Sequence, residues 1–330
     1  MDATNNRTTG SWRLNLGLAV GGVAAGLALA FVVFGPDNDP VPNLDGAYHG
    51  IYQRSDDPIL QSELRPGANG FVNADGFIGR DYAVTKPNGT FRIVGLGDSV
   101  TMYYSIERLN YLSLLEESLP ARTGTPVEVL NFGVASYETP QMVRQLETKG
   151  LKYTPDFVLL GYCINDGTDF VQLAARLAGP AAREGRPSDD NLETHLHIRR
   201  AAARQRLSWH DLFRDHIAPR RKWTESLEAF RGLQALSVEH GFGVLVVIFP
   251  ALLELDDYYL APLHEALGAE LEGLGFGVVD LRAPFRDAAP SEALRTNPRD
   301  AIHPNSRGYE VAADHVEEWL SEHRPWASRP

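Results

Sequence analysis

The chain has 330 residues, of which 43% are hydrophobic and 22% are charged, as in an ordinary globular protein of one large domain or two small ones. Its formal net charge of −12 argues against a nucleic-acid partner, because phosphate binding needs clustered Lys and Arg. The single cysteine, Cys163, excludes an intramolecular disulfide and any metal site built from several cysteines.

The N-terminal part of the chain is predicted to anchor it in a membrane. Residues 14–34 read LNLGLAVGGVAAGLALAFVVF and carry no charge. A helix of this length spans roughly 30 Å, about the thickness of the hydrocarbon core of a bilayer. Arg7 and Arg13 precede it and aspartates follow it, so the positive-inside rule places residues 1–13 in the cytoplasm and the remaining chain outside it. The alternative is a cleaved signal peptide, with small residues at 28–30 as the cleavage site and a secreted product.

A linker and one α/β domain are predicted after the anchor. Residues 35–48, rich in Pro, Asp and Asn, form the linker, and a domain over 49–330 begins with an irregular, turn-rich lead-in over 49–90. Short apolar runs rich in β-branched residues are predicted strands, at 91–96, 127–131, 157–161, 244–249 and 278–281. Helical patterns alternate with them, at 106–118, 140–149, 223–239, 258–274 and 306–321. This alternation predicts a parallel sheet covered by helices on both faces.

One stretch, 170–222, interrupts the alternation. It is helical in composition and basic, with cations at Arg199, Arg200, Arg204, Arg206, Arg220, Arg221 and Lys222. Charge runs are usually solvated faces, so the first interpretation is a solvated helical insertion over the sheet edge. The alternatives are a cap over the active site, or a surface that faces an anionic substrate or a lipid.

Ser99 follows the first predicted strand, in the sequence FRIVGLGDSVT over 91–101. Ligands of doubly wound sheets bind beyond the carboxyl ends of the strands, where a sharp turn can expose a serine hydroxyl. The dinucleotide-binding motif fails here, because Val100 occupies its third glycine position. The lipase elbow G-x-S-x-G also fails, because Thr101 replaces its last glycine. A turn serine without function remains the alternative.

An acid and a histidine stand three residues apart near the other end of the chain, in the sequence DAIHP over 300–304. A serine hydroxyl is a poor nucleophile until a base takes its proton. The imidazole that does so needs a carboxylate to fix its tautomer and to stabilise its charged form. Asp300 and His303 can supply both groups, although either alone could be an ordinary surface residue.

Four sequence blocks together resemble the SGNH (GDSL-like) hydrolases. They are GDSV at 97–100, NFGVAS at 131–136, GYCIND at 161–166 and DAIHP at 300–304, and they occur in the family's order over roughly 91–320. The resemblance, with the strand–helix alternation, implies a doubly wound, flavodoxin-like parallel sheet of about five strands in a three-layer α/β/α sandwich. The predicted transmembrane helix precedes this domain.

The resemblance implies a role for each block. It makes Ser99 the nucleophile, His303 the base and Asp300 the partner of that base. It also assigns an oxyanion hole to the backbone N–H groups of Ser99 and Gly133 and to the side-chain amide of Asn165. Fixed donors stabilise the charge that acyl transfer places on the carbonyl oxygen. Cys163 occupies a position where the third block of the family has glycine, so the backbone near Asn165 is expected to differ.

Other polar and aromatic residues are assigned weaker roles. Cys163 is expected to be a buried cysteine rather than an alternative nucleophile. Asp98 and Asp166 stand beside turns, where acids commonly cap backbone groups. No metal site is expected, because nothing nearby completes a ligand set with Glu193, His195 and His197. The candidates for lining the substrate pocket, each of which could equally be a packing residue, are Tyr103, Tyr104 and Tyr137.

The sequence therefore predicts a membrane-anchored, extracytoplasmic serine esterase that needs no cofactor. Its expected substrate is a carboxylic ester, such as an O-acetyl group on an envelope or exported glycan or a lipid ester. The alternatives are an O-acyltransferase that passes the acyl group to a sugar hydroxyl, and a non-catalytic module that binds a glycan or a partner. The expected partners are the ester substrate and the membrane, through residues 14–34; the oligomeric state stays open.

Overall fold

The computed structural model describes residues 50–102, 110–178 and 191–327. The predicted cytoplasmic segment, anchor and linker lie outside these ranges, so the anchor at 14–34 stays a prediction. Within the described ranges, no helix combines the length and the apolar character that crossing a bilayer requires.

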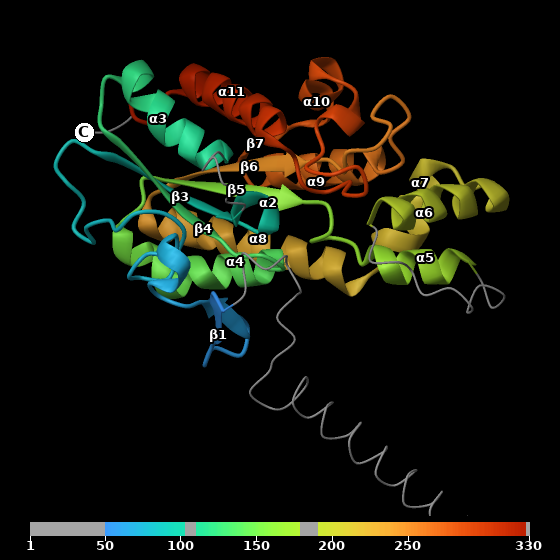
Figure 1. Ribbon diagram of the computed structural model, residues 1–330, viewed down its shortest axis with the longest axis horizontal. Helices are drawn as coiled ribbons and strands as arrows, with labels where there is room; N and C mark the ends of the chain where they lie inside the picture. Colours follow the sequence, from blue (N-terminus) through green and yellow to red (C-terminus); the bar gives the residue numbers. More distant parts are fainter. Residues whose placement is uncertain (1–49, 103–109, 179–190, 328–330) are drawn as a thin grey trace, which may run out of the picture.

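The centre of the molecule is a sheet of five parallel strands (Figure 1). Its order is β4-β3-β5-β6-β7, which is 2-1-3-4-5 in chain order and matches the flavodoxin-like arrangement. Each strand begins within one residue of its predicted start; their bounds are β3 Phe91–Gly97, β4 Val127–Gly133, β5 Phe157–Cys163, β6 Gly243–Phe249 and β7 Gly277–Asp280. Every residue of β3 and β5 is buried, because helices cover both faces of the sheet.

Helices on both faces complete the three layers (Figure 1). The helices α3 and α11 pack together on one face, and α4 packs against α8 on the other. The bounds of the sheet-covering helices are α3 Tyr111–Thr123, α4 Thr139–Gln145, α8 Arg221–His240, α9 Ala261–Gly273 and α11 Ser306–His323. The helix predicted over 106–118 is α3 and runs from 111 to 123, because the Asn110 side chain accepts hydrogen bonds from the backbone N–H groups of Leu112 and Ser113 and caps the helix there.

The described part of the lead-in is more ordered than the sequence predicts. It contains a small antiparallel pair, β1 Tyr52–Arg54 with β2 Ser62–Leu64, and a short 3₁₀ turn at Ala68–Gly70. Strands of three residues are too short to show the alternation of polar and apolar residues by which strands are recognised. The hydroxyl of Tyr137 donates to the carbonyl of Ser62 at 2.6 Å and so joins this pair to the main domain.

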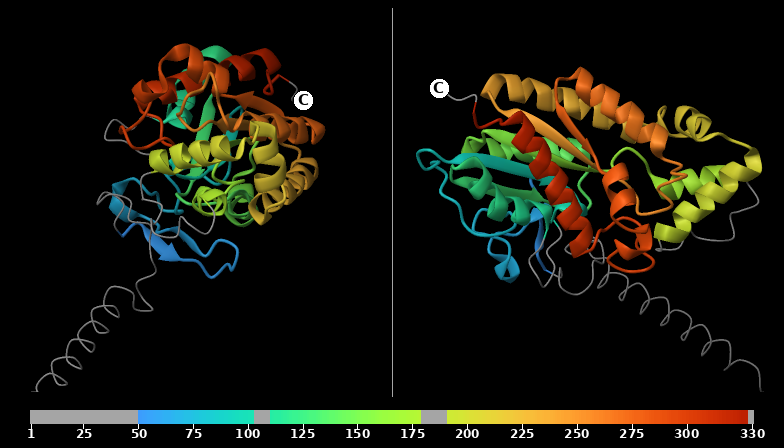
Figure 2. Two further views of the ribbon diagram at one scale, coloured as in Figure 1. Left: turned by 90° about the vertical axis from the view of Figure 1, so that its right-hand side faces the viewer. Right: turned by 90° about the horizontal axis from the view of Figure 1, so that it is seen from above.

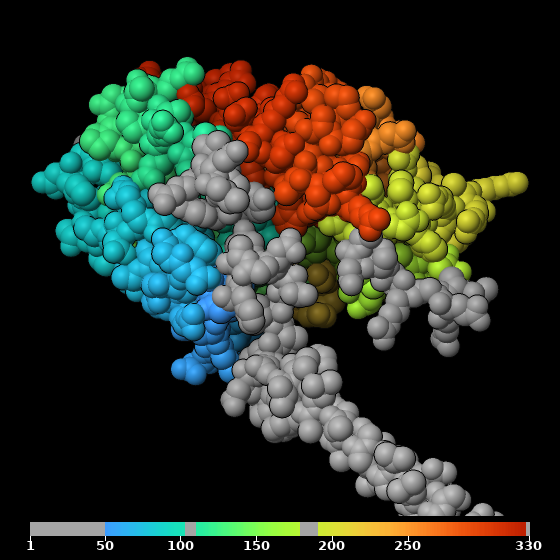
Figure 3. Space-filling model, viewed as in Figure 1, coloured from blue at the N-terminus to red at the C-terminus, as the bar shows by residue number. Residues whose placement is uncertain are grey.

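The insertion is helical, as predicted, but it lies beyond the end of the sheet toward which β5 points, not over a sheet edge (Figures 1 and 2). It contains α5 Phe170–Ala178, α6 Asn191–Gln205 and α7 Trp209–Leu212, and a π turn at Phe213–Ile217 connects α7 to the segment before α8. These helices form one end of the molecular surface (Figure 3). On the other side of the strand ends, α10 Arg282–Ala288 and a 3₁₀ turn at Ser291–Ala293 lead to the loop that contains Asp300.

Candidate active site

Ser99 is the first residue of a short helix, α2 Ser99–Met102, that starts directly beyond β3. This helix packs so closely on β4 that a Cβ atom on Gly133 would lie 2.3 Å from the backbone nitrogen of Met102, which explains the glycine. The side-chain amide of Asn131 donates to the carbonyl of Thr101 at 3.0 Å, and the hydroxyl of Tyr309 donates to that of Val100 at 3.0 Å. Hydrogen bonds from one side chain of β4 and one of α11 therefore hold the turn that carries Ser99.

The folded chain brings Ser99, His303 and Asp300 into one line of hydrogen bonds. The Nε2 atom of His303 lies 2.8 Å from the Oγ of Ser99, and its Nδ1 atom lies 2.7 Å from the Oδ2 of Asp300. Ser99 follows β3, which lies between β4 and β5 in the sheet. The loop that contains Asp300 and His303 leads into α11, which packs against α3 on one face of that sheet. This geometry lets the imidazole take a proton from the serine while the carboxylate holds the opposite ring nitrogen.

The second oxygen of Asp300 is held by three donors. Its Oδ1 accepts hydrogen bonds from the backbone N–H groups of Ile302 at 2.9 Å and His303 at 3.2 Å. The third donor is the side-chain amide of Asn191, at 3.0 Å, and the Oδ1 of Asn191 accepts in turn from the backbone N–H of Ala301 at 2.6 Å. Asn191 is the first residue of α6, so the insertion reaches the acid of the candidate site.

No signal in the sequence identifies Asn191. It stands after two aspartates at the start of a helical pattern, where an asparagine usually caps its own helix. Its partner Asp300 lies 109 residues further along the chain. Only the packing of α6 against the Asp300 loop brings the two side chains together.

The contact between Asp300 and His303 shifts both pKa values in the directions that a base needs. Burial raises the pKa of Asp300, but the hydrogen bond and the charge of His303, with the bond from Asn191, lower it well below its usual range. Burial lowers the pKa of His303, but the hydrogen bond and charge of Asp300, with a smaller contribution from Asp98, raise it above the ordinary value. Asp300 is therefore ionised at neutral pH and favours protonation of His303.

Two of the predicted oxyanion-hole donors, Gly133 and Asn165, lie close to the turn at Ser99 and have contacts of their own. The backbone N–H of Gly133 donates to the Oδ1 of Asn131 at 2.9 Å. Asn165 lies beyond β5, and its side chain helps to lower the pKa of buried Asp98, which places it beside the residue that precedes Ser99. Within the described ranges, the Oδ1 of Asn165 is buried and accepts no hydrogen bond.

The two acids that follow β3 and β5 are buried within the protein. The Oδ1 of Asp98 accepts from the backbone N–H of Val100 at 2.9 Å, so this side chain caps the turn at Ser99. Asp166 accepts a hydrogen bond from the hydroxyl of Thr139 at 3.2 Å. Burial raises the pKa of both carboxyls, and the charge of Asp98 raises that of Asp166 further. Both residues support the strand ends from within.

Several of the remaining sequence candidates are packing residues. Cys163 is buried, and burial raises the pKa of its thiol well above the usual value, so it stays protonated and is a poor nucleophile. His195 is buried against Phe170, its Nδ1 is hydrogen-bonded to the hydroxyl of Tyr259, and burial lowers its pKa to about 3. Tyr137 is buried and holds the β1–β2 pair through the contact described above, which is a packing role; its place in the substrate pocket stays a prediction.

The other candidates are placed as follows. Glu193 forms an exposed ion pair with Arg200 at 3.0 Å, and His197 lies on the same helix, half-buried. Among the residues that the structure describes, no three His, Cys, Asp or Glu side chains are grouped in a way that could hold a metal ion. Tyr103 and Tyr104 fall outside the described ranges.

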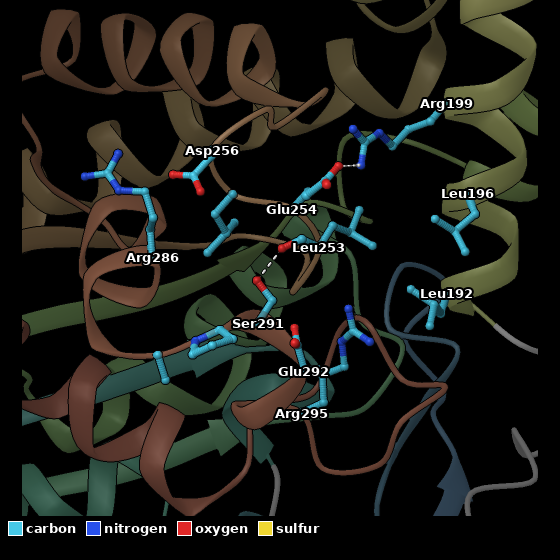
Figure 4. Close-up of a pocket in the computed structure, with 13 residues that line it drawn as sticks. Leu192, Leu196, Arg199, Leu253, Glu254, Asp256, Arg286, Ser291, Glu292 and Arg295 are labelled. Carbon is cyan, nitrogen blue, oxygen red and sulfur yellow. Dashed lines mark hydrogen bonds and ion pairs between the residues drawn. The ribbon is translucent and has the colours of Figure 1, made fainter.

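A pocket of about 400 Å³ adjoins the Asp300 loop (Figure 4). Leu192, next to Asn191, lines it and donates its backbone N–H to the carbonyl of Arg299 at 3.3 Å. Figure 4 shows charged side chains of both signs around it, with Arg199 and Glu254 joined by an ion pair of 2.6 Å. Ser99, Asp300 and His303 do not line this pocket.

Comparisons with known proteins assign most of the domain. Residues 96–311 match the family model described as the GDSL-like Lipase/Acylhydrolase family, and this range includes Ser99, Asp300 and His303. No curated protein sequence matches the chain. A similar solved structure is a lipase/acylhydrolase from Enterococcus faecalis, with 16% identity, 71% of this chain and 96% of that chain covered, and a TM-score of 0.45. A catalytic mutant of an acetylxylan esterase from Geobacillus stearothermophilus has 13% identity, covers 69% of this chain and 93% of its own, and has a TM-score of 0.45. A putative lipolytic protein of the G-D-S-L family from Desulfitobacterium hafniense has 11% identity, covers 69% of this chain and 98% of its own, and has a TM-score of 0.42.

Proposed function

Because the chain belongs to the GDSL-like lipase/acylhydrolase family, we propose that it is a serine esterase that hydrolyses carboxylic esters through an acyl-enzyme. The observation that carries this proposal is the pair of contacts on His303: 2.8 Å from Nε2 to the Oγ of Ser99 and 2.7 Å from Nδ1 to Asp300. A nucleophile, a base within hydrogen-bond reach and a third group that orients the base are together the requirement for covalent acyl transfer.

The proposed reaction proceeds in two halves. The Oγ of Ser99 attacks the ester carbonyl while His303 takes the hydroxyl proton, and the tetrahedral intermediate collapses when His303 gives that proton to the leaving alcohol. Water then loses a proton to His303 and attacks the acyl-serine, which releases the carboxylic acid and returns the hydrogen to Ser99. Asp300 stays ionised throughout and stabilises the imidazolium that forms in each half.

The charge that develops on the carbonyl oxygen needs fixed donors. We assign this role to the backbone N–H groups of Ser99 and Gly133 and to the side-chain amide of Asn165. The N–H of Gly133 must then exchange the Oδ1 of Asn131, its present acceptor at 2.9 Å, for the substrate oxygen. A donor that is already fixed in direction by the β4–α2 contact gains more from the developing oxyanion than from a neutral amide oxygen.

For the substrate we propose an O-acetyl group on an envelope or exported glycan, or a lipid ester. This choice rests on the predicted anchor at 14–34 and on the predicted position of the domain outside the cytoplasm. The second candidate is an O-acyltransferase, which would pass the acyl group from Ser99 to a sugar hydroxyl instead of water. A non-catalytic binding module would have no need for the Ser99–His303–Asp300 contacts.

The first experiment uses the purified full-length chain and a fluorophosphonate probe. We expect a single adduct on Ser99 by mass spectrometry and none in Ser99→Ala. Turnover of p-nitrophenyl acetate is measured beside that of a long-chain ester, and we expect the acetyl ester to react faster. Labelling that persists in Ser99→Ala would refute the nucleophile, and faster turnover of the long chain would favour a lipase. Acetyl transfer to an added sugar, measured against acetate release, separates transferase from hydrolase.

The second experiment tests the anchor and its orientation. A reporter that works only outside the cytoplasm is fused to the C-terminus, and we expect it to be active. Membrane association that survives a carbonate wash is expected for an anchor, whereas a cleaved signal peptide would release the domain. Activity of a cytoplasm-only reporter at the same position would reverse the predicted orientation.

A further inference from the structure

A second pocket, of about 230 Å³, lies between the segment after β5, the helix α5, the π turn of the insertion and the start of α8. It begins at Gly167, two residues beyond Asn165. Its lining is rich in cations although the whole chain has a net charge of −12. None of the residues proposed for ester hydrolysis lines it.

Two arginines in this pocket share one hydrogen-bond acceptor. The Nη2 of Arg176 and the Nε of Arg220 each lie 3.4 Å from the same acceptor, the carbonyl oxygen of His216. Within the described residues, neither guanidinium forms an ion pair with a carboxylate. Burial and the charge of Arg220 both lower the pKa of Arg176, although the proximity of Asp169 opposes this. Two like charges so close to one another repel, and an anion between them would relieve that repulsion.

Further donors face the same pocket. The 20-residue helix α8 starts at Arg221, and its N-cap residue, Arg220, makes no side-chain capping bond, so the first N–H groups of the helix have no cap from that side chain. The partial positive charge of a helix N-terminus adds to that of the arginines. Thr168, which also lines the pocket, is only 4% exposed, and within the described ranges its hydroxyl has no hydrogen-bond partner.

The other charged groups around the pocket already have partners. Lys222 pairs with Glu138 at 2.7 Å, and Arg221 pairs with Glu225 at 2.8 Å. Among the described residues of the lining, the one acid is Asp169, whose Oδ1 accepts from the backbone N–H of Gln172 at 2.9 Å and so caps α5. In the part of the chain that the structure describes, two guanidinium groups without an ion pair stand against one carboxylate, which gives this lining a positive charge.

We propose that this pocket binds a phosphate-type oxyanion, either free phosphate or the phosphate group of a phosphate ester. Two guanidinium forks and a helix N-terminus supply donors from several directions, which suits a tetrahedral group with many acceptor sites better than a planar carboxylate. The volume is several times the ~30 Å³ that a water molecule occupies, so a phosphate and part of an attached group fit. This proposal is independent of the proposed esterase activity.

The test is equilibrium dialysis of the full-length protein against radiolabelled inorganic phosphate at constant ionic strength, since salt screens such contacts. We expect saturable binding that weakens about tenfold in each of Arg176→Gln and Arg220→Gln, because each removes a charge-assisted hydrogen bond. The matched control is Arg214→Gln, which removes an exposed arginine of the same insertion that pairs with Asp211 and Asp215 outside the pocket. Binding by this control is expected to equal that of the wild type.

A competition arm distinguishes the two sources of the anion. Stronger competition by glycerol phosphate than by unlabelled phosphate indicates a phosphate ester as the ligand, and equal competition indicates the free anion. Thr168→Val should weaken binding by a smaller factor, because it removes one neutral donor. No saturable binding by the wild type, or unchanged binding by both Arg176→Gln and Arg220→Gln, would overturn the proposal. Esterase turnover of these variants is expected to match the wild type, which separates this test from that of the proposed function.

Discussion

Asn191→Ala should lower the turnover of the proposed esterase, although Asn191 acts on the site through Asp300 rather than through Ser99 or His303. The change removes the amide that donates to the Oδ1 of Asp300 at 3.0 Å and the acceptor of the Ala301 N–H at 2.6 Å. A hydrogen bond to a charged group is worth about 1.5–3 kcal/mol. If all of this is lost from the transition state, kcat falls by roughly 10- to 100-fold. Two backbone donors still hold Asp300, so the loss should stay smaller than for removal of the acid itself.

The assay is kcat and KM on p-nitrophenyl acetate, measured well below the melting temperature of each variant. We expect kcat to fall and KM to change little, since Asn191 acts through Asp300. The matched control is Glu193→Gln, in the same turn of α6 but exposed and paired with Arg200 at the surface, which should keep wild-type turnover.

A second substitution separates positioning from packing. Asn191→Asp preserves the size of the side chain but places a carboxylate against Asp300, and two like charges at this distance raise one pKa and disturb the orientation of the acid. We therefore expect it to be less active than Asn191→Ala. Wild-type turnover of Asn191→Ala, or higher turnover of Asn191→Asp than of Asn191→Ala, would refute the reasoning.

Four further predictions concern the same site and are all measured as kinetics on one ester. Alanine at Ser99 or His303 should remove nearly all activity, whereas Asp300→Ala should keep measurably more than His303→Ala, because Asp300 only orients and supports the base; a fully active His303→Ala would mean that another base is at work. His303 must be neutral to accept a proton, and Asp300 raises the pKa of His303. As the pH is lowered, kcat/KM should therefore begin to fall at a pH above the ordinary pKa of histidine. Asp300→Asn should move this fall to lower pH, and a move to higher pH would contradict the electrostatic argument. Asn165→Ala should lower kcat by roughly 100- to 1000-fold with a smaller effect on KM, as for other oxyanion-hole amides, and an effect confined to KM would remove Asn165 from that role. Cys163→Ser should stay active and keep its fluorophosphonate labelling, whereas loss of labelling would point to the thiol.

The strands could be predicted because burial on both faces of the sheet requires apolar side chains at successive positions. A parallel strand covered by helices reads as a continuous apolar run, and every residue of β5 is buried, as its sequence FVLLGYC suggests. Helix boundaries were less predictable. The helix α3 begins at Tyr111 because Asn110 caps it, and this choice depends on two backbone hydrogen bonds rather than on the apolar pattern. The β1–β2 pair escaped prediction because its strands have only three residues each.

The candidate site residues also came from the chain: Ser99 stands at a predicted strand end and Asp300 before the last helix, and the resemblance of the four sequence blocks to the GDSL-like family added Asn165. The expected burial of Cys163 is confirmed, and burial raises the pKa of its thiol. Burial also lowers the pKa of His195, and its contact with the Tyr259 hydroxyl is one that the sequence alone did not predict.

What the sequence by itself determined is local: where strands and helices run, and which polar residues stand where they end. What the tertiary structure decided is which of those residues meet. Ser99 and His303 are 204 residues apart and Asn191 and Asp300 are 109 residues apart, yet each pair is joined by a hydrogen bond. Such contacts depend on the order of the strands and on the packing of α6 and α11 around their ends. A hydrogen bond acts over about 3 Å, and no propensity or periodicity within one segment sets a distance that small between two segments.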